Sequence, residues 1–237
     1  FTKILKQDGF EVALFDTTCY EHSSTTSSEK RIETLQYRPF NPETDVLWEP
    51  ISSDRLIPDF IKKINNFAPD LILCSVVEDT FKQALLLIDA IANLNIPTLF
   101  GGVFITAAPE FAMSYKSVKM IGVGEGEQII KSVANNLRNN ITLENIPNLW
   151  IKDENGEIKK NSPGSLIDVN IEIPDFSLFD ETRFLRPMGG RVFKTLPLET
   201  YRGCPFQCAF CNSPMQVRFA KNNKLGNFLS TINVDRI

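Results

Sequence analysis

The chain has 237 residues, of which 43% are hydrophobic and 23% are charged, a balance that is ordinary for one large globular domain or two small ones. Its formal net charge of -4 argues against a nucleic-acid partner, which usually meets a basic surface. The sequence has no signal peptide and no apolar run of the roughly 20 residues that span a bilayer, so no membrane partner is expected. Five cysteines, three of them clustered, do not suit a secreted disulfide framework, and we predict a cytoplasmic protein whose thiols stay reduced.

The first half of the chain alternates short apolar runs with helical patterns. Residues 1–9 predict the end of a helix that Gly9 stops. Continuous apolar strands that alternate with helices predict an α/β fold, in which helices cover both faces of a parallel sheet and ligands bind at the carboxyl ends of the strands. The expected strands are 11–15, 71–75, 97–100 and 118–122, and the expected helices are 54–66, 79–94, 107–115 and 125–138.

The second half begins with a connector and ends with a new structural unit. Residues 150–159 predict a hairpin that turns at Asn155-Gly156. A strand is expected at 195–201, although Pro197 weakens the pattern, and a helix near Leu225. Strand, loop and helix in this order are typical of the first unit of a TIM-type β/α barrel.

These patterns predict three segments. An α/β domain occupies residues 1–140 and lacks its first strand, a linker occupies 141–195, and the start of a barrel occupies 196–237. We expect both ends to be cut, because the chain opens on the end of a helix and stops where a new element begins.

Three cysteines lie together in the segment Tyr201-Arg-Gly-Cys-Pro-Phe-Gln-Cys-Ala-Phe-Cys211. Cys204, Cys208 and Cys211 have C-x3-C-x2-C spacing, and three thiolates can hold three irons of a [4Fe–4S] cluster while the fourth iron stays open for a small molecule. A Cys3His zinc site and three unrelated cysteines are the alternatives. Zinc motifs usually bring ligands in two close pairs, and the one histidine, His22, lies far away in sequence. We therefore predict an open iron–sulfur cluster.

The cysteine motif, with an aromatic residue before its last cysteine, resembles the radical S-adenosylmethionine (SAM) superfamily. The resemblance covers residues 196–237 and implies that Cys204, Cys208 and Cys211 ligate the cluster. It also implies that SAM binds the fourth iron, that an electron from the cluster cleaves SAM to a 5′-deoxyadenosyl radical, and that Phe210 lies near the SAM adenine. The other SAM-binding elements of the family come later in its barrel.

Glycines follow two of the expected strands of the α/β domain. Gly101-Gly102 follows residues 97–100, and Gly124-Glu-Gly-Glu127 follows residues 118–122. Glycine lets the backbone approach a ligand, but Glu125 and Glu127 place negative charge where a phosphate would otherwise meet a helix N-terminus. Because the chain has neither G-x-G-x-x-G after a first strand nor a P-loop, a nicotinamide or ATP domain is disfavoured. Tight turns are the alternative reading of these glycines.

The segment Ser75-Val-Val-Glu78 at one strand end, with Gly101-Gly102 at the next, resembles the Rossmann-like (flavodoxin-like) cobalamin-binding domain. Together with the Gly-Glu-Gly-Glu segment and the cysteine loop, it is similar to the cobalamin-dependent radical SAM group. The cofactor-binding residues that this resemblance implies are Ser75, Val76, Gly101, Gly102, Gly124 and Glu125. The D-x-H-x-x-G loop that supplies a histidine to cobalt in some cobalamin proteins is not seen, which leaves the lower cobalt ligand open.

The predicted function is a radical SAM enzyme with three cofactors, a [4Fe–4S] cluster, SAM and cobalamin. The resemblance implies methyl transfer to an unactivated carbon of a small-molecule or peptide substrate, with a flavodoxin- or ferredoxin-type reductant for the cluster. No residue of this segment is assigned as a catalytic acid or base, and the segment alone is expected to be inactive, because most of the barrel is lacking.

Three alternatives stay open. They are a cobalamin-dependent radical cyclisation or rearrangement, a methylthiotransferase-like enzyme, and a non-catalytic cofactor-binding module. Cys19 and Cys74 are candidate ligands for the second cluster of a methylthiotransferase. A buried thiol at Cys74 and a loop thiol at Cys19 are the favoured reading, since free cysteine is commonly a small core residue.

Overall fold

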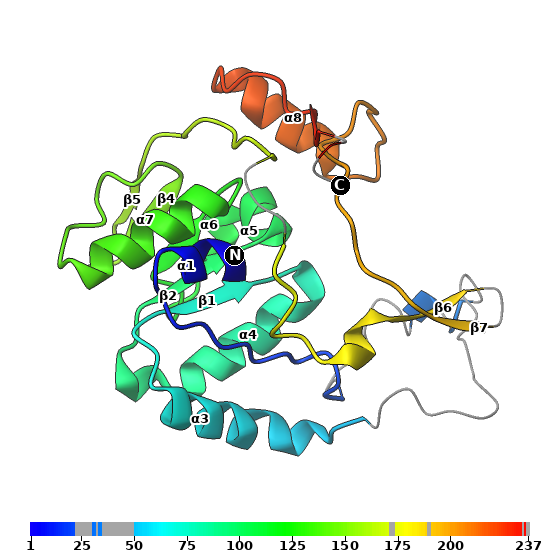
Figure 1. Cartoon of the computed structure of the whole chain (residues 1–237). Coiled ribbons are helices and arrows are strands. Elements are labelled where there is room, and N and C mark those ends of the chain that lie inside the picture. The colour runs from blue at the N-terminus through cyan, green and yellow to red at the C-terminus, as the bar shows by residue number, and fades with distance from the viewer. Residues whose placement is uncertain are drawn as a thin grey trace. The chain divides into compact units, whose positions relative to one another are not determined.

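The computed structural model describes residues 1–21, 30–31, 33–34, 50–170, 174–188, 191–233 and 235. His22 lies outside the described residues. The chain forms two compact units, whose helices and strands are labelled in Figure 1. The larger unit comprises Phe1–Val12, Pro69–Asp175 and Glu199–Ile237, and the smaller comprises Ala13–Ala68 and Phe176–Leu198. The domain boundaries expected from the sequence stay a prediction.

A five-stranded sheet is the centre of the larger unit, with strand order β1-β2-β3-β4-β5. The first three strands are parallel, and the last two continue the sheet in antiparallel pairing. The strands are β1 (Ile72–Ser75), β2 (Thr98–Gly101), β3 (Met120–Gly122), β4 (Leu149–Lys152) and β5 (Ile158–Lys160). The strands predicted at 71–75, 97–100 and 118–122 are confirmed, and they form the parallel part of the sheet.

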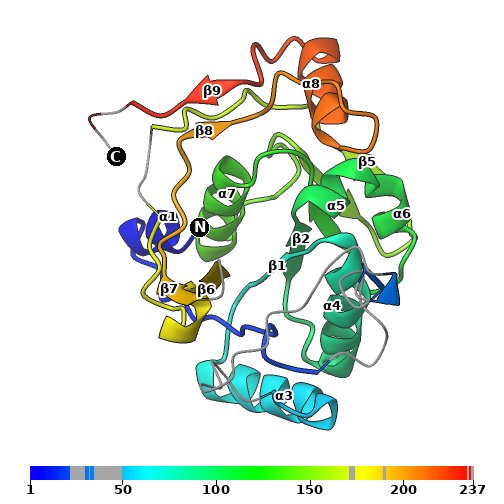
Figure 2. The ribbon, with the colours of Figure 1, turned by 90° about the vertical axis from the view of Figure 1, so that its right-hand side faces the viewer.

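Helices cover both faces of this sheet (Figure 2). Leu99 of β2 packs in a core cluster with Leu5 and Val133 on one face. On the other face the neighbouring Phe100 meets Phe81 edge-on, with ring centroids 6.2 Å apart. Successive strand residues point to opposite faces, so this alternation places α1 and α7 on one side and α4 on the other. The helical elements of this region are α1 (Thr2–Gln7), α4 (Glu78–Ala90), a 3-10 turn (Ala92–Leu94), α5 (Val103–Ala107), α6 (Pro109–Met113) and α7 (Glu127–Arg138).

The hairpin predicted at 150–159 is confirmed as β4 and β5. Gly156 has φ +86°, and the Asp153 carboxylate accepts the backbone N–H of Glu157 at 2.8 Å, which closes the turn. The hairpin also adds two strands to the sheet, because Leu149 of β4 pairs with Gly122 of β3. The sequence did not predict this extension.

Two expected elements of the first half are corrected. The helix expected at 107–115 is two short helices, α5 and α6, which break at Ala108 (φ -138°, ψ 57°) because Pro109 disfavours helical geometry in the residue before it. The strand expected at 11–15 is wrong, since these residues form no strand. Phe15 instead packs against the rings of Tyr20 and Phe60 in the smaller unit, which gives it apolar contacts without a sheet.

The smaller unit has one long helix and one hairpin. The helix predicted at 54–66 is confirmed as α3, preceded by a short 3-10 turn, and it ends where Ala68 adopts the left-handed conformation (φ +49°). Strands β6 and β7 pair in antiparallel fashion. The elements are a 3-10 turn (Ser53–Arg55), α3 (Leu56–Phe67), a second 3-10 turn (Glu181–Phe184), β6 (Leu185–Met188) and β7 (Arg191–Lys194).

The last segment contains strand, cysteine loop and helix in the predicted order. The strand expected at 195–201 is reduced to β8 (Tyr201–Arg202), which pairs antiparallel with β9 (Ser230–Thr231). The helix expected near Leu225 is wrong, because α8 (Ser213–Asn222) begins soon after the last cysteine, with a proline in its first turn. The barrel itself stays a prediction. No helix in the described part of the chain combines the length and the apolar character needed to cross a membrane.

Candidate functional site

The carboxyl ends of the parallel strands bring four predicted site residues together. Ser75 ends β1 directly opposite Gly101 at the end of β2. The next residue, Val76, donates its backbone N–H to the Gly101 carbonyl at 3.0 Å, and its side chain is buried. Ser75 is exposed, so its hydroxyl is accessible at the edge of the sheet where ligands of parallel sheets bind.

Gly101 and Gly102 lie side by side at this edge, and different physical reasons account for a glycine at each position. Gly102 has φ +104°, and a Cβ atom there would lie 2.5 Å from the carbonyl oxygen of Val76, so the fold itself excludes a side chain. A Cβ atom on Gly101 would meet no atom within 4 Å. Gly101 therefore faces open space, as expected for a position where a ligand approaches the backbone.

Thr106 joins the loops after β2 and β3. Its hydroxyl donates to the Gly102 carbonyl at 3.2 Å and accepts the backbone N–H of Gly124 at 3.0 Å. The threonine lies one helical turn beyond Gly102 and is 9% exposed. Sequence reasoning missed this residue, although a threonine four positions after a Gly-Gly pair is placed to hydrogen-bond a carbonyl of the preceding turn.

Glu125 follows Gly124 and makes contacts with two distant segments. One carboxylate oxygen accepts the backbone N–H of Ile167 at 2.7 Å, and the other lies 3.3 Å from a guanidinium nitrogen of Arg202. Glu125 thus lies at the predicted edge, and both of its oxygens have partners within the protein.

Arg202, which sequence reasoning also missed, lies two residues before the first cysteine. The guanidinium contacts Glu127 at 2.9 Å and binds both oxygens of Glu199 at 3.0 and 3.1 Å, in addition to Glu125. Burial opposes its charge, but the hydrogen bonds to Glu199 and the charges of Glu127 and Glu199 outweigh burial and raise the pKa of Arg202 above its usual value. Arg202 is therefore charged at every accessible pH.

The cysteine loop runs from the end of β8 to the start of α8. Cys208 and Cys211 are exposed, Cys204 is half-buried, and Phe210 is 94% exposed. The backbone N–H of Ser213, the first residue of α8, donates to the sulfur of Cys211 at 3.4 Å. Among the residues that the structure describes, no three side chains of His, Cys, Asp or Glu are gathered so that they could hold a metal ion.

The three thiols nevertheless have the donor chemistry that iron prefers. Their loop has little packing that would oppose a rearrangement, since two of its cysteines and Phe210 project into solvent. Metal binding commonly orders its own ligands, because the free energy of binding is also folding free energy. The ligand set Cys204, Cys208 and Cys211 therefore stays a prediction that fits the chemistry of the loop.

Cys74 has different surroundings from the cysteines of the loop. Burial raises the pKa of Cys74, in β1, to about 12, so its thiol stays protonated at neutral pH. A protonated thiol is a poor metal ligand. This favours the structural reading of Cys74 over a role in a second cluster.

A cavity of about 410 Å³ lies between the edge of the sheet and the cysteine loop, within the larger unit. Its size is within the range of ligand pockets. Its lining residues include Gly102, Thr106, Gly124, Glu125, Arg202 and Cys204, which belong to the features described above. Three predicted cobalamin contacts and one predicted cluster ligand therefore line one cavity, whereas Ser75, Val76 and Gly101 are not among its lining residues.

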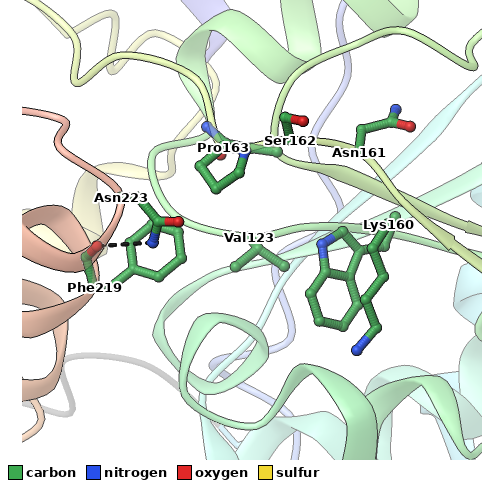
Figure 3. A pocket seen from close by; sticks show the side chains of 9 residues that line it. Val123, Lys160, Asn161, Ser162, Pro163, Phe219 and Asn223 are labelled. Carbon is green, nitrogen blue, oxygen red and sulfur yellow. Dashed lines mark hydrogen bonds between the residues drawn. The ribbon is translucent and has the colours of Figure 1, made fainter.

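A second cavity, of about 330 Å³, lies where α8 faces the hairpin (Figure 3). Phe219 and Asn223 of α8 line one side, and Val123 and Pro163 lie across from them. Lys160, the charged residue of this cavity, forms an ion pair with Glu110 of α6 at 2.8 Å. Its ammonium nitrogen also lies over the Trp150 ring, 4.1 Å from the ring centroid. None of the predicted site residues lines this cavity, so it has less of the character of a ligand site than the first.

Comparison with known proteins gives a family match and related sequences. Residues 42–134 match the model of the B12 binding domain. An uncharacterized methyltransferase of Pyrococcus horikoshii is 29% identical over 171 residues, which cover 70% of this chain and 36% of that protein. The 4'-phospho-dehydrooxetanocin synthase of Priestia megaterium is 28% identical over 173 residues, which cover 68% of this chain and 22% of the synthase. The chain thus spans about a third or less of the length of these relatives.

Solved structures support the same fold. The radical SAM methyltransferase TsrM from Kitasatospora setae, with tryptophan substrate and a SAM analog bound, aligns over 100% of this chain and 40% of its own, with a TM-score of 0.58 and 16% identity. The cobalamin-dependent SAM radical enzyme OxsB, with aqua-cobalamin bound, aligns over 75% of this chain and 27% of its own, with a TM-score of 0.51 and 23% identity. At these identities the alignments establish the fold, a mixed α/β architecture around a mostly parallel sheet.

Proposed function

From the match of residues 42–134 to the B12 binding domain, and from the fold shared with solved cobalamin-dependent radical SAM enzymes, we propose that this chain binds cobalamin and SAM for methyl transfer to an unactivated carbon. The cavity between the sheet edge and the cysteine loop carries the proposal. A methyl carrier and a radical source must act on the same substrate, so their sites must be adjacent, and this cavity is lined from both sides.

The cobalamin contacts belong to the carboxyl edge of the sheet. The open space at Gly101 leaves room for a large planar ligand to approach the backbone, and the exposed Ser75 hydroxyl can donate or accept a hydrogen bond there. Gly102 and Thr106 hold the loop behind this surface in place. We assign Val76 and Gly124 to the same surface through their backbone, and Glu125 to its margin.

The cluster belongs to the cysteine loop, with Cys204, Cys208 and Cys211 as ligands and Phe210 beside SAM. When bound, the cluster supplies the electron that cleaves SAM into methionine and a 5′-deoxyadenosyl radical, and cobalamin carries the methyl group. The protein supplies thiolates, orientation and exclusion of water. A flavodoxin- or ferredoxin-type reductant and a reducing cytoplasm complete the proposal, because the thiolates must stay reduced.

The substrate class in this proposal is a small molecule or a peptide. The similarity to a protein named as a methyltransferase supports methyl transfer. The similarity to a protein named as a synthase supports a second candidate, a cobalamin-dependent radical cyclisation or rearrangement with the same cofactors.

The test uses the full-length protein, reconstituted without oxygen with iron, sulfide and hydroxocobalamin. SAM and a reductant are added, and 5′-deoxyadenosine and S-adenosylhomocysteine are quantified. Methyl transfer predicts both products, because one SAM gives the radical and another gives the methyl group. Formation of 5′-deoxyadenosine alone would favour the rearrangement, and failure to retain cobalamin would exclude both.

Two cysteine variants make this test specific. Cys204→Ala should abolish 5′-deoxyadenosine, because it removes a proposed cluster ligand. Cys19→Ala is the matched control and should leave the yield unchanged. Loss of product in Cys19→Ala would instead favour a methylthiotransferase-like enzyme, in which that cysteine holds a second cluster.

A further inference from the structure

One arginine connects the start of the cysteine loop to the edge of the sheet. A guanidinium nitrogen of Arg202 lies 2.9 Å from Glu127 and 3.3 Å from Glu125, and both of these glutamates follow β3. The same guanidinium binds Glu199 in a bidentate arrangement. Its planar fork of donors thus reaches three carboxylates from two segments of the chain.

These contacts are partly shielded from water. The Arg202 side chain is 25% exposed, that of Glu125 14% and that of Glu127 21%. Fully exposed ion pairs contribute little, whereas removing one partner of a shielded pair leaves its counterpart uncompensated. Glu125 is held in turn by the backbone N–H of Ile167, so the carboxylate that receives Arg202 is itself oriented.

The backbone next to Arg202 is fixed as well. Arg202 pairs with Ser230 between β8 and β9. Gly203 has φ +97°, and a Cβ atom on it would overlap the backbone carbonyl of Phe228, so this residue is packed directly against another part of the chain. The loop therefore leaves a fixed point just before Cys204, while Cys208 and Cys211 further along it are exposed.

We infer that Arg202 is a positioning residue for the cysteine loop, and that it acts through Glu125 and Glu127 to fix where Cys204 lies relative to the carboxyl edge of the sheet. This contact would set the distance between the cluster and cobalamin, a consequence that rests on the proposed function. Glu125 thereby has a second role, as the acceptor that holds the loop.

The test compares Arg202→Gln with the wild type in the full-length, anaerobically reconstituted protein. Hydrogen–deuterium exchange of peptides that cover 201–212 should become faster, on the order of tenfold, while peptides of β1 and β2 keep their rates. Glu125→Gln should act in the same direction, and the double variant should show less than the sum of the two effects, because both remove one interaction. Arg55→Gln is the matched control, since Arg55 is 63% exposed and pairs with Asp59 one helical turn away.

A second readout separates positioning from simple stabilisation. SAM changes the EPR spectrum of a reduced cluster that it binds, and in Arg202→Gln a higher SAM concentration should be needed for that change. Faster exchange with an unaltered SAM titration would overturn the inference, and so would unchanged exchange at 201–212.

If Arg202→Gln fails to fold, Arg202→Lys decides. Lysine keeps the positive charge but lacks the planar set of guanidinium donors, so Arg202→Lys should also speed hydrogen–deuterium exchange at 201–212. Wild-type exchange rates there would overturn the inference. Cobalamin retention is read separately by absorbance. A protein that does not retain cobalamin would count against the proposed function, while the exchange rates and the SAM titration still decide the role of Arg202.

Discussion

Substitution of the two adjacent glycines after β2 should separate folding from cofactor binding. In Gly102→Ala the new Cβ atom lies 2.5 Å from the carbonyl oxygen and 2.9 Å from the nitrogen of Val76, and both are backbone atoms that a rotamer change cannot move. The backbone of Gly102 (φ 104°, ψ 177°) also lies in a region that is essentially restricted to glycine, which costs about 1–3 kcal/mol for alanine. Displacement of the neighbouring strand adds about 1–3 kcal/mol.

The expected loss for Gly102→Ala is therefore at least about 2 kcal/mol in the free energy of unfolding. For a protein of this size that corresponds to a decrease in Tm of at least about 4 °C, measured by calorimetry or by circular dichroism. A Gly102→Ala variant with the Tm of the wild type would refute the packing argument for this residue.

Gly101→Ala is the matched control for stability and the test for binding. Its Cβ atom meets nothing within 4 Å, so the free energy of unfolding should change by less than about 0.5 kcal/mol. If cobalamin lies against this backbone, the methyl group should weaken binding on the order of tenfold, or about 1.4 kcal/mol, in an absorbance titration. An unchanged Kd in Gly101→Ala would place the cofactor elsewhere.

Two further predictions concern single side chains of the site. Thr106→Val removes the hydroxyl that joins the loops after β2 and β3, so it should lower the free energy of unfolding by about 1–3 kcal/mol, measured by urea unfolding. Thr106→Ser keeps the hydroxyl and should stay near the wild type. Equal losses in both variants would contradict a stabilising role of these hydrogen bonds. Because burial raises the pKa of Cys74 to about 12, iodoacetamide should alkylate the exposed Cys208 well before Cys74 in metal-free protein at pH 8, as followed by mass spectrometry. Equal rates would argue against a raised pKa of Cys74.

The sequence predicted the sheet edge well, because its signals are local. Apolar runs that end in Ser75 and Gly101 predict strands and their ends, and the parallel pairing that the structure confirms places those ends side by side. These strands are near-continuous apolar runs because helices cover both faces of the sheet.

Features that depend on contacts between residues far apart in the chain could not be predicted from local sequence patterns. Glu125 and Arg202 are 77 residues apart, and nothing in either local pattern indicates that they meet. The addition of β4 and β5 to the sheet is similar, since a hairpin pattern does not specify the edge on which the hairpin packs. The start of α8 does have a local signal, because Ser213-Pro214 places a proline in the first turn of the helix, where proline is common.

We propose that Cys204, Cys208 and Cys211 hold a redox cluster next to a cobalamin site. The most direct measurement is EPR spectroscopy of the full-length protein after anaerobic reconstitution and reduction, with the variant in which all three cysteines are alanine as comparison. We predict a [4Fe–4S] signal that SAM perturbs in the wild type, and loss of that signal with retention of cobalamin in the triple variant. A cluster signal that survives in the triple variant would contradict the account.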